Sequence, residues 1–331
     1  MKKILALVLT LVMGIALIGC GEDETTIGVL IPGADHGFTG ESVSHAIAGT
    51  ERLAEENGFA FKVLTSSTVV EQSNQIEQLI SEGVDVIVLW PHNGDELKSA
   101  AQQILDADIP LIIYDRLISD FDETAELMGD NFTIGEDMGT YFNGYFADEL
   151  AAGEVHILEF KGDNSSVPTQ RSEGFYETAD DNFVTDQQYV TNWSKDTAQQ
   201  QMETFLTTNS AADVAKVQAV FTHDAEVALG VLAALEGYDG SKEINIKLVS
   251  AVSAPKELLE KFDHYEALGF DQVTFSFSPA MVVDAIQLGI DILNGEDVSG
   301  MYLVPTEMVD NDNYEAFMQG EVYTYRYSIY E

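Results

Sequence analysis

The 331-residue sequence predicts an α/β protein with two similar lobes, each built around a parallel sheet. Short apolar, β-branched runs alternate with longer stretches of helical period, which is the pattern of βαβ units. A second series of this kind begins near Val155. At about 100 to 200 residues per domain, the length also fits two domains, each large enough to bury its own core.

The first series covers residues 27 to 114. Apolar runs predict strands at 27–31, 59–64, 84–89 and 109–114. Helices are predicted at 71–82, which Gly83 ends, and at 95–107. The helix after the first strand should place Val43, Ile47 and Leu53 on one buried face. Apolar strands linked by helices indicate a parallel sheet covered on both faces.

The second series repeats the pattern. No long Pro- or Ser-rich linker separates it from the first, so short ordered crossings should join the lobes. Its predicted strands are 155–160, 188–191, 217–222 and 246–250, and its predicted helices are 170–179, 197–206, 225–235 and 255–262.

The first twenty residues predict an export signal. Lys2 and Lys3 precede an apolar run at 4–18, which is shorter than the roughly 20 residues that a membrane span needs. Leu17-Ile18-Gly19-Cys20 resembles the lipobox of bacterial lipoproteins, which implies a signal peptide at 1–19 and lipidation of Cys20. Residues 20–25 would be a polar tether. The alternative, a cleaved signal followed by a free thiol, would expose that thiol to intermolecular oxidation.

Charge and motifs exclude several classes of function. The chain has 57 Asp and Glu residues against 15 Lys and Arg, a net charge of −42, so it lacks the basic surface that nucleic acids and anionic membranes attract. One cysteine cannot form an intramolecular disulfide or a multi-thiolate metal site. Because no catalytic motif is present, we expect no enzyme, cofactor or metal. A zinc site at His36, His92, His223 and Asp224 remains an alternative without a recognised ligand spacing.

Polar and aromatic residues follow the predicted strands of both series. Ligands of open parallel sheets bind beyond the carboxyl ends of the strands. Rings stack on the C–H faces of a sugar-like molecule while carboxylates and amides bind its hydroxyls, so these residues predict a neutral polyhydroxylated ligand. The candidates are Asp35, His36, Phe38, Trp90, His92, Asp115, Arg116, Asn164, Trp193 and Asp224.

Each candidate also has a structural interpretation. Asp115 and Arg116 could form a structural ion pair, and Trp90 could belong to the core of its lobe. Trp193 could support the start of a helix that Ser194 caps. The histidines could be ordinary hydrogen-bonded residues. The placement of all of them at one sheet edge favours a ligand site.

Seven stretches match a known family: 75–88, 91–94, 113–116, 129–131, 171–175, 228–230 and 305–307. With them, residues 26 to about 314 resemble the type I periplasmic sugar-binding proteins of ABC transporters, particularly those for ribose, xylose and related aldoses. The resemblance implies two Rossmann-like lobes joined by a three-crossing hinge, with crossings near Asn131, Phe277 and Pro305. Lobe one would comprise 26–131 plus 278–304, and lobe two 132–277 plus 305–331.

The resemblance also implies roles for individual residues. Asp115 and Arg116 match the main hydroxyl-binding pair of the family, and Asn131, Thr169, Arg171 and Phe277 join the candidate set. The family's ligand residue aligns closer to Thr169 than to Arg171. Two departures indicate a more aromatic, less polar second lobe: residues 250–253 replace a Gly-x-Asp segment, and Phe277 stands where relatives often place a Gln.

The expected function follows from this resemblance. It is that of a monomeric extracytoplasmic subunit that captures an aldose in the interlobe cleft and delivers it to an ABC permease by hinge closure, attached to the membrane by lipid only. The alternatives are a sensor subunit that serves a chemoreceptor or histidine kinase, a binder of a non-sugar polyol, and an exported hydrolase. A repressor would need an N-terminal helix-turn-helix where the signal lies.

Overall fold

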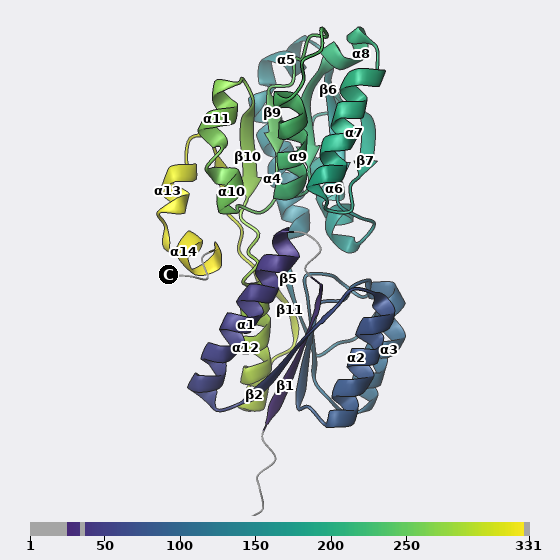
Figure 1. Ribbon diagram of the computed structural model, residues 1–331, viewed down its shortest axis with the longest axis vertical. Helices are drawn as coiled ribbons and strands as arrows, with labels where there is room; N and C mark the ends of the chain where they lie inside the picture. The colour runs from purple at the N-terminus through teal and green to yellow at the C-terminus, as the bar shows by residue number, and fades with distance from the viewer. Residues whose placement is uncertain (1–24, 34–36, 328–331) are drawn as a thin grey trace, which may run out of the picture.

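The computed structural model describes residues 25–33 and 37–327. The predicted signal peptide, Cys20 and the candidates Asp35 and His36 lie outside the described residues. The described chain forms two lobes, one above the other in Figure 1, each with a six-stranded sheet between helices. All strand pairs are parallel except β10 with β12, which confirms the predicted α/β class.

The first sheet has the strand order β11-β5-β4-β3-β1-β2. Helices α2 and α3 pack against each other on one face, and α1 and α12 on the other (Figure 1). The strands are β1 (Thr26–Pro32), β2 (Ala60–Ser66), β3 (Val86–Leu89), β4 (Leu111–Tyr114), β5 (Ala125–Gly129) and β11 (Gly300–Val304). The helices are α1 (Gly37–Asn57), α2 (Val69–Glu82), α3 (Gly94–Asp106) and α12 (Met281–Leu293).

The second sheet has the order β12-β10-β9-β8-β6-β7, with α4 and α6 packed together and α7 packed on α9. Its strands are β6 (Val155–Lys161), β7 (Phe183–Val190), β8 (Val217–Thr222), β9 (Leu248–Ser250), β10 (Asp271–Phe275) and β12 (Met308–Asp310). Its helices are α4 (Asn131–Tyr145), α5 (Ala147–Ala152), α6 (Ser166–Thr178), α7 (Lys195–Thr208), α8 (Ala211–Lys216), α9 (Ala225–Glu236), α10 (Lys256–Leu259), α11 (Phe262–Ala267), α13 (Tyr314–Met318) and α14 (Glu321–Tyr327).

The chain passes between the sheets three times, after β5, after β10 and after β11. The three connecting segments lie close together where the two lobes join (Figure 1). This arrangement points the carboxyl ends of the parallel strands of both sheets toward the space between the lobes. None of the helices in the described part of the chain is both long and apolar enough to cross a bilayer.

Several local predictions are confirmed. Gly83 follows α2 in the left-handed conformation at φ 72°, and its N–H bonds to the carbonyl of Ile80 at 3.1 Å. The side chain of Ser194 caps α7 by accepting the N–H of Thr197 at 3.2 Å. Strand β1 is buried on both faces, because Val29 and Leu30 belong to apolar clusters on opposite sides of the sheet.

The prediction for the buried face of α1 is wrong at Ile47, which is 49% exposed. The buried face of α1 carries mostly small or polar residues, among them Ser42, Ala46 and Gly49. A Cβ atom at Gly49 would lie 2.7 Å from a methyl of Val283 in α12, so the two helices approach closely at this glycine. The close approach selects small residues for the buried face and leaves Ile47 outside it.

Other boundaries differ from the predictions. The chain between 125 and 152 forms β5, α4 and α5, for which we predicted no elements. Strand β7 begins at Phe183 rather than at 188, and its polar sequence reflects its place at the edge of the sheet. The predicted helix at 255–262 is α10 followed by the separate α11.

Candidate ligand-binding site

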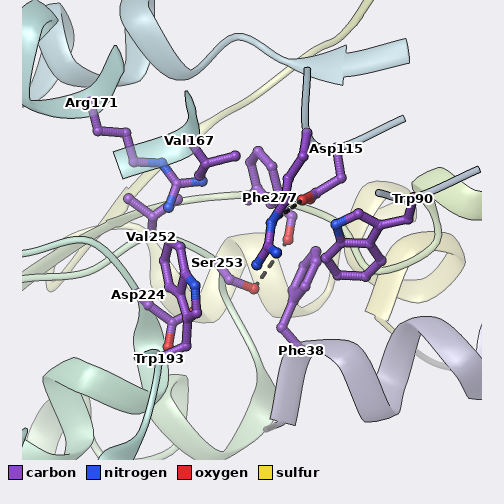
Figure 2. Close-up of a pocket in the computed structure, with 11 residues that line it drawn as sticks. Phe38, Trp90, Asp115, Val167, Arg171, Trp193, Asp224, Val252, Ser253 and Phe277 are labelled. Carbon is purple, nitrogen blue, oxygen red and sulfur yellow. Dashed lines mark hydrogen bonds and ion pairs between the residues drawn. The ribbon is translucent and has the colours of Figure 1, made fainter. Parts of the chain in front are cut away.

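A cavity lies between the lobes, at the carboxyl ends of strands from both sheets (Figure 2). Eight of its lining residues are candidates predicted from the sequence. The lining comprises Phe38, Trp90, Asp115 and Arg116 from the first lobe, and Val167, Arg171, Trp193, Asp224, Val252, Ser253 and Phe277 from the other side. Both tryptophans of the chain therefore reach this cavity.

Aromatic rings form one wall of the cavity. The ring of Phe38 lies edge-on to Trp90 at 5.9 Å and contacts Phe277 at 5.5 Å. A Cβ atom at Gly129 would lie 2.0 Å from the ring of Phe277, so the absence of a side chain at Gly129 makes room for that ring. Trp90 is only 2% exposed and also contacts Tyr114, so it is both part of the core and part of the cavity wall.

Trp193 approaches from the second lobe on a strained turn. Asn192 and Trp193 both have left-handed φ angles, 51° and 61°, which are uncommon for residues other than glycine. A Cβ atom at Gly162 would lie 2.2 Å from the indole, so this glycine leaves the space that the ring occupies. Backbone strain of this kind is typical of functional sites, and here it directs a large aromatic side chain into the cavity.

Asp115 and Arg116 follow β4 and do not form a tight pair. Arg116 donates from Nη1 to the carbonyl of His92 at 2.6 Å, whereas its Nε lies 4.0 Å from Asp115 Oδ1. That Nε is buried and has no hydrogen-bond partner within the part of the chain that the structure describes. Asp115 has φ 68°, and burial raises the pKa of its carboxyl to about 6 despite the nearby Arg116 and Arg171. Both side chains therefore retain hydrogen-bonding capacity toward the cavity.

Arg171 is buried on the opposite side of the cavity. It donates from Nε to Asn131 Oδ1 at 2.9 Å and from Nη1 to the carbonyl of His223 at 2.5 Å, and its guanidinium carbon lies 4.7 Å from the centre of the Phe277 ring. Burial lowers the pKa of Arg171 to about 10, and the charges of Asp224 and Asp115 oppose that shift. Asn131, a sequence candidate, thus supports Arg171 from behind and does not line the cavity.

Asp224 sits at the start of α9. Its Oδ1 accepts the N–H groups of Glu226 at 2.8 Å and Val227 at 3.3 Å, which makes it the N-cap of the helix. Burial, followed by the charge of Glu226, raises the pKa of its carboxyl to about 7. Asp115 and Asp224 are therefore two buried carboxyls in one cavity, and each has fewer partners than full ionisation requires.

Three other candidates lie just outside the cavity. His92, Asn164 and Thr169 line a second, more open and more polar hollow that shares Arg116 with the cavity. The hydroxyl of Thr169 donates to the carbonyl of Ser165 at 2.9 Å. The family resemblance favoured Thr169 over Arg171 as a ligand residue, but the structure places Arg171 in the cavity wall and Thr169 in the outer hollow.

Sequence reasoning missed three lining residues, Val167, Val252 and Ser253. Ser253 has φ 77°, and its hydroxyl donates to the carbonyl of Phe277 at 3.1 Å. Neither apolar residue carries a chemical signal for ligand binding, since each reaches the cavity only through the course of its loop or helix. No group of three or more His, Cys, Asp or Glu residues in the described ranges is placed to hold a metal ion.

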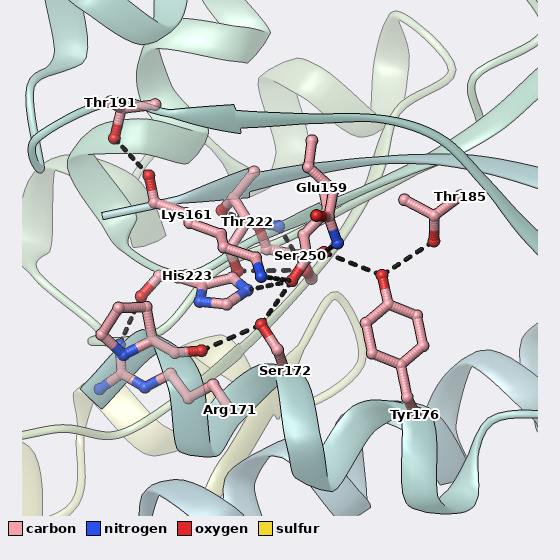
Figure 3. Close-up of polar contacts among 12 residues, drawn as sticks. Glu159, Lys161, Arg171, Ser172, Tyr176, Thr185, Thr191, Thr222, His223 and Ser250 are labelled. Atoms are coloured by element: carbon pink, nitrogen blue, oxygen red, sulfur yellow. Dashed lines mark hydrogen bonds and ion pairs between the residues drawn. The ribbon is translucent and has the colours of Figure 1, made fainter. Parts of the chain in front are cut away.

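A polar network lies behind the cavity in the second lobe (Figure 3). Glu159 is fully buried and accepts hydrogen bonds from Ser172 at 2.6 Å, Tyr176 at 2.8 Å and Gln188 at 2.5 Å. His223 Nε2 lies 3.1 Å from the same carboxylate and so donates to it. Burial raises the pKa of Glu159, but the hydrogen bonds of His223 and Ser172 bring it down to about 2.

The network connects directly to the cavity. His223 is fully buried, and burial lowers its pKa, so the ring is neutral at pH 7. Its backbone carbonyl accepts the hydrogen bond from Arg171, and the next residue in the chain is Asp224. The Glu159–His223 contact therefore fixes the backbone that holds two charged residues of the cavity wall.

Comparison with known proteins agrees with this architecture. A family model described as "Periplasmic binding protein domain" matches residues 27–297. The ribose import binding protein of Bacillus subtilis is 26% identical over 229 residues, which cover 64% of this chain and 72% of the relative. The D-xylose-binding periplasmic protein of Escherichia coli is 28% identical over 191 residues, 53% of this chain and 52% of the relative.

Solved structures share the whole fold. A protein from Mycobacterium smegmatis in complex with β-D-fucofuranose has a TM-score of 0.78 at 22% identity, covering 91% of this chain and 96% of its own. An ABC transporter solute binding protein from Bacillus halodurans with bound myo-inositol has a TM-score of 0.76 at 23% identity, covering 89% and 98%. The resemblance seen in the sequence is thus confirmed, and the chain belongs to the periplasmic binding protein domain family.

Proposed function

We propose that the protein captures a single neutral sugar, an aldose or a closely related ring, in the cavity between its lobes. The observation that carries the proposal is the combination of buried, incompletely paired polar groups with aromatic faces. Asp115 and Asp224 have raised pKa values, and Arg116 Nε has no partner within the described chain. Sugar hydroxyls would donate to the carboxylates and accept from the arginine, while C–H faces would stack on Trp90 and Trp193.

The enclosure of the cavity by both lobes supports one ring rather than a chain of sugars. Its lining combines four aromatic rings with four charged side chains, drawn from both lobes, which suits a single small polar ring. Relatives named for ribose and xylose support an aldose. The structural neighbour with bound myo-inositol keeps a cyclic polyol as an alternative ligand.

The proposed mechanism is closure of the two lobes around the ligand. We retain lobe one as 26–131 plus 278–304 and lobe two as 132–277 plus 305–331, with the three passages between the sheets as the hinge. A ligand that contacts Asp115 in one lobe and Arg171 in the other favours the closed state through those additional contacts. An epimer would leave a buried charged group unpaired, which gives specificity.

The proposal includes the cellular setting. Membership of the periplasmic binding protein family supports an extracytoplasmic location and the role of a monomeric binding subunit, without catalysis, that delivers its sugar to an ABC permease. Lipidation of Cys20 would be its only membrane attachment. Cys20→Ser should release the protein from the membrane fraction, and a pull-down with sugar present would distinguish a permease from a chemoreceptor or histidine kinase as the partner.

Titration calorimetry tests the sugar assignment. The panel would contain D-ribose, D-xylose, L-arabinose, D-glucose, D-galactose and myo-inositol, each added to the protein after dialysis or partial unfolding to remove retained ligand. We expect saturable heat with one binding site for at least one member. No binding of any pentose, hexose or inositol would contradict the proposal.

A further inference from the structure

Asp163 lies outside the sugar cavity but contacts residues from both of its walls. It follows β6 in the second lobe and lines the outer hollow. Its Oδ2 lies 3.2 Å from Nη2 of Arg116, which belongs to the first lobe. Its Oδ1 accepts the N–H of Ser165 at 2.9 Å, so the carboxylate is fixed by its own loop.

The electrostatics of Asp163 agree with its contact with Arg116. Burial would raise the pKa of its carboxyl, but the charge of Arg116 and hydrogen bonds from Ser165 and from the Trp193 side chain together lower it. Asp163 thus interacts with Arg116, a cavity residue of the first lobe, and with Trp193, a cavity residue of the second. It is not itself among the residues that line the cavity.

A second contact between the lobes lies beside this one. The backbone N–H of Leu117 donates to Ser166 Oγ at 3.3 Å, so the segment after β4 is bound to the start of α6 at two adjacent points. The Arg116 and Asp163 side chains are 10% and 25% exposed, which places the pair in a partly desolvated environment where an ion pair is stronger than at the surface.

The geometry also fixes the orientation of Arg116. Nη1 of Arg116 donates to the carbonyl of His92, and Nη2 pairs with Asp163. The outer edge of the guanidinium is therefore bound to residues of both lobes. Of the three guanidinium nitrogens, Nε is the one without a partner in the described chain. The two outer contacts therefore hold Arg116 with its unpaired donor available to the cavity.

We propose that Asp163 is a positioning residue that latches the two lobes together through Arg116, orients Arg116 in the cavity wall, and thereby sets how slowly the ligand leaves. This inference rests on the proposed sugar binding. The contact forms only when the lobes are closed, so it acts on dissociation more than on association. The latch also holds closed lobes together without ligand.

The test compares Asp163→Asn with Asp95→Asn. Asp95 lines the same outer hollow but forms no ion pair with Arg116 in the described part of the chain. Its variant therefore controls for the loss of one negative charge. Both tryptophans line the cavity, so stopped-flow intrinsic fluorescence can follow sugar dissociation without a label. We expect Asp163→Asn to raise the dissociation rate by about tenfold with little change in the association rate, and Asp95→Asn to match the wild type.

Two further readouts separate a latch from a general structural role. Rising sodium chloride should speed dissociation from the wild type toward the rate of Asp163→Asn, and should affect that variant less, because salt screens the ion pair. Small-angle scattering of the ligand-free proteins should give a larger radius of gyration for Asp163→Asn than for the wild type or Asp95→Asn. Ser166→Ala, which leaves the carboxylate in place, should raise the dissociation rate in the same direction by a smaller factor.

The outcomes distinguish the two proposals. If the wild type binds a sugar and Asp163→Asn and Ser166→Ala both dissociate at the wild-type rate, the latch is wrong and the proposed function stands. If the wild type binds no sugar, the proposed function is wrong, and the scattering comparison alone decides whether Asp163 holds the lobes together. Equal radii of gyration for all the ligand-free proteins would then overturn the latch.

Discussion

The molecule buries carboxyl groups in two regions, and their pKa values shift in opposite directions. In the polar network, Glu159 receives hydrogen bonds from Ser172, Tyr176 and Gln188 and has a pKa of about 2. In the cavity, Asp224 has a pKa of about 7 because burial and the charge of Glu226 disfavour its ionised form. Asp115, across the cavity, shows the same behaviour at about 6.

The difference lies in where each carboxylate finds its partners. The donors of Glu159 come from α6, from β7 and from His223 directly after β8, all in its own lobe, so its charge is compensated within the folded protein. Asp115 and Asp224 line the cavity and lack an equivalent set of hydrogen-bond donors. An unsatisfied buried carboxyl is unfavourable for stability, and it persists where a ligand supplies the missing donors.

The largest expected effect is on stability, from Glu159→Ala. The change leaves Ser172, Tyr176, Gln188 and His223 without their common acceptor in a buried site. Breaking a buried charged network typically costs about 3 to 5 kcal/mol, so we expect a lower free energy of unfolding by that amount. Urea denaturation measures it, with the exposed Glu203→Ala as a control. A loss below about 1 kcal/mol would mean that the network is not a stabilising unit.

The next largest effect is on binding, from Asp115→Asn. Replacing an acceptor-only carboxylate by an amide removes the best hydroxyl partner in the first lobe, so the dissociation constant should rise by about a hundredfold. Because the Asp115 carboxyl has a raised pKa, the melting temperature should stay the same or rise. Calorimetry and thermal denaturation on one sample measure both quantities. Near-normal affinity would show that the ligand does not use this cavity.

A smaller effect is expected from Gly162→Ala. Its Cβ atom would lie 2.2 Å from the Trp193 indole, so the ring must leave its place in the cavity wall. Loss of one stacking ring should weaken sugar binding by about tenfold. Gly153→Ala, where a Cβ atom meets no neighbour within 4 Å, is the matched control for binding. Equal affinities for the two variants would indicate that Trp193 does not stack on the ligand.

The smallest effects concern the pH dependence of stability. For Glu159, whose pKa is lowered, the stabilising contribution is present above pH 4.5 and is lost as the pH falls toward about 2. For Asp224, whose pKa is raised to about 7, the folded state binds the proton more tightly, so stability rises as the pH falls from about 8 toward 4.

Unfolding titrations at several pH values separate the two contributions. Asp224→Asn should flatten part of the change above pH 5, and it retains a side-chain oxygen that can cap α9. Other carboxyls contribute to the same range, including Glu41, whose pKa burial and Glu226 raise to about 7. If the difference in free energy of unfolding between the wild type and Asp224→Asn stays constant from pH 5 to pH 8, the raised pKa is contradicted.

The sequence predicted the fold because its apolar periodicity is strong. Strands such as 217–222 coincide with the observed β8. The residues that follow the strands supplied six of the cavity residues, and the family resemblance supplied two more, Arg171 and Phe277. The prediction that Ile47 is buried was wrong, because the packing of α1 on α12 selects small residues. A periodicity argument does not consider such packing. The order of the strands, rather than any single residue, brings Asp115 and Asp224 together.

Other features were beyond the reach of the sequence. Glu159, Ser172, Gln188 and His223 come from different elements, and only the pairing of β6 with β7 and β8 brings them into one network. Asp163 was not among the sequence candidates, because its contact with Arg116 joins two lobes that only the folded chain brings together. Contacts of this kind leave no periodic signal in the chain.

The most direct test of the central claim is a crystal structure of the protein with the sugar that calorimetry identifies. The account predicts one sugar ring between the lobes, in contact with Trp90 and Trp193. Its hydroxyls should hydrogen-bond to Asp115, Arg116, Arg171 and Asp224, the four charged residues that line the cavity. Density for the sugar elsewhere, or a ring held without contact to Asp115 and Asp224, would contradict the account.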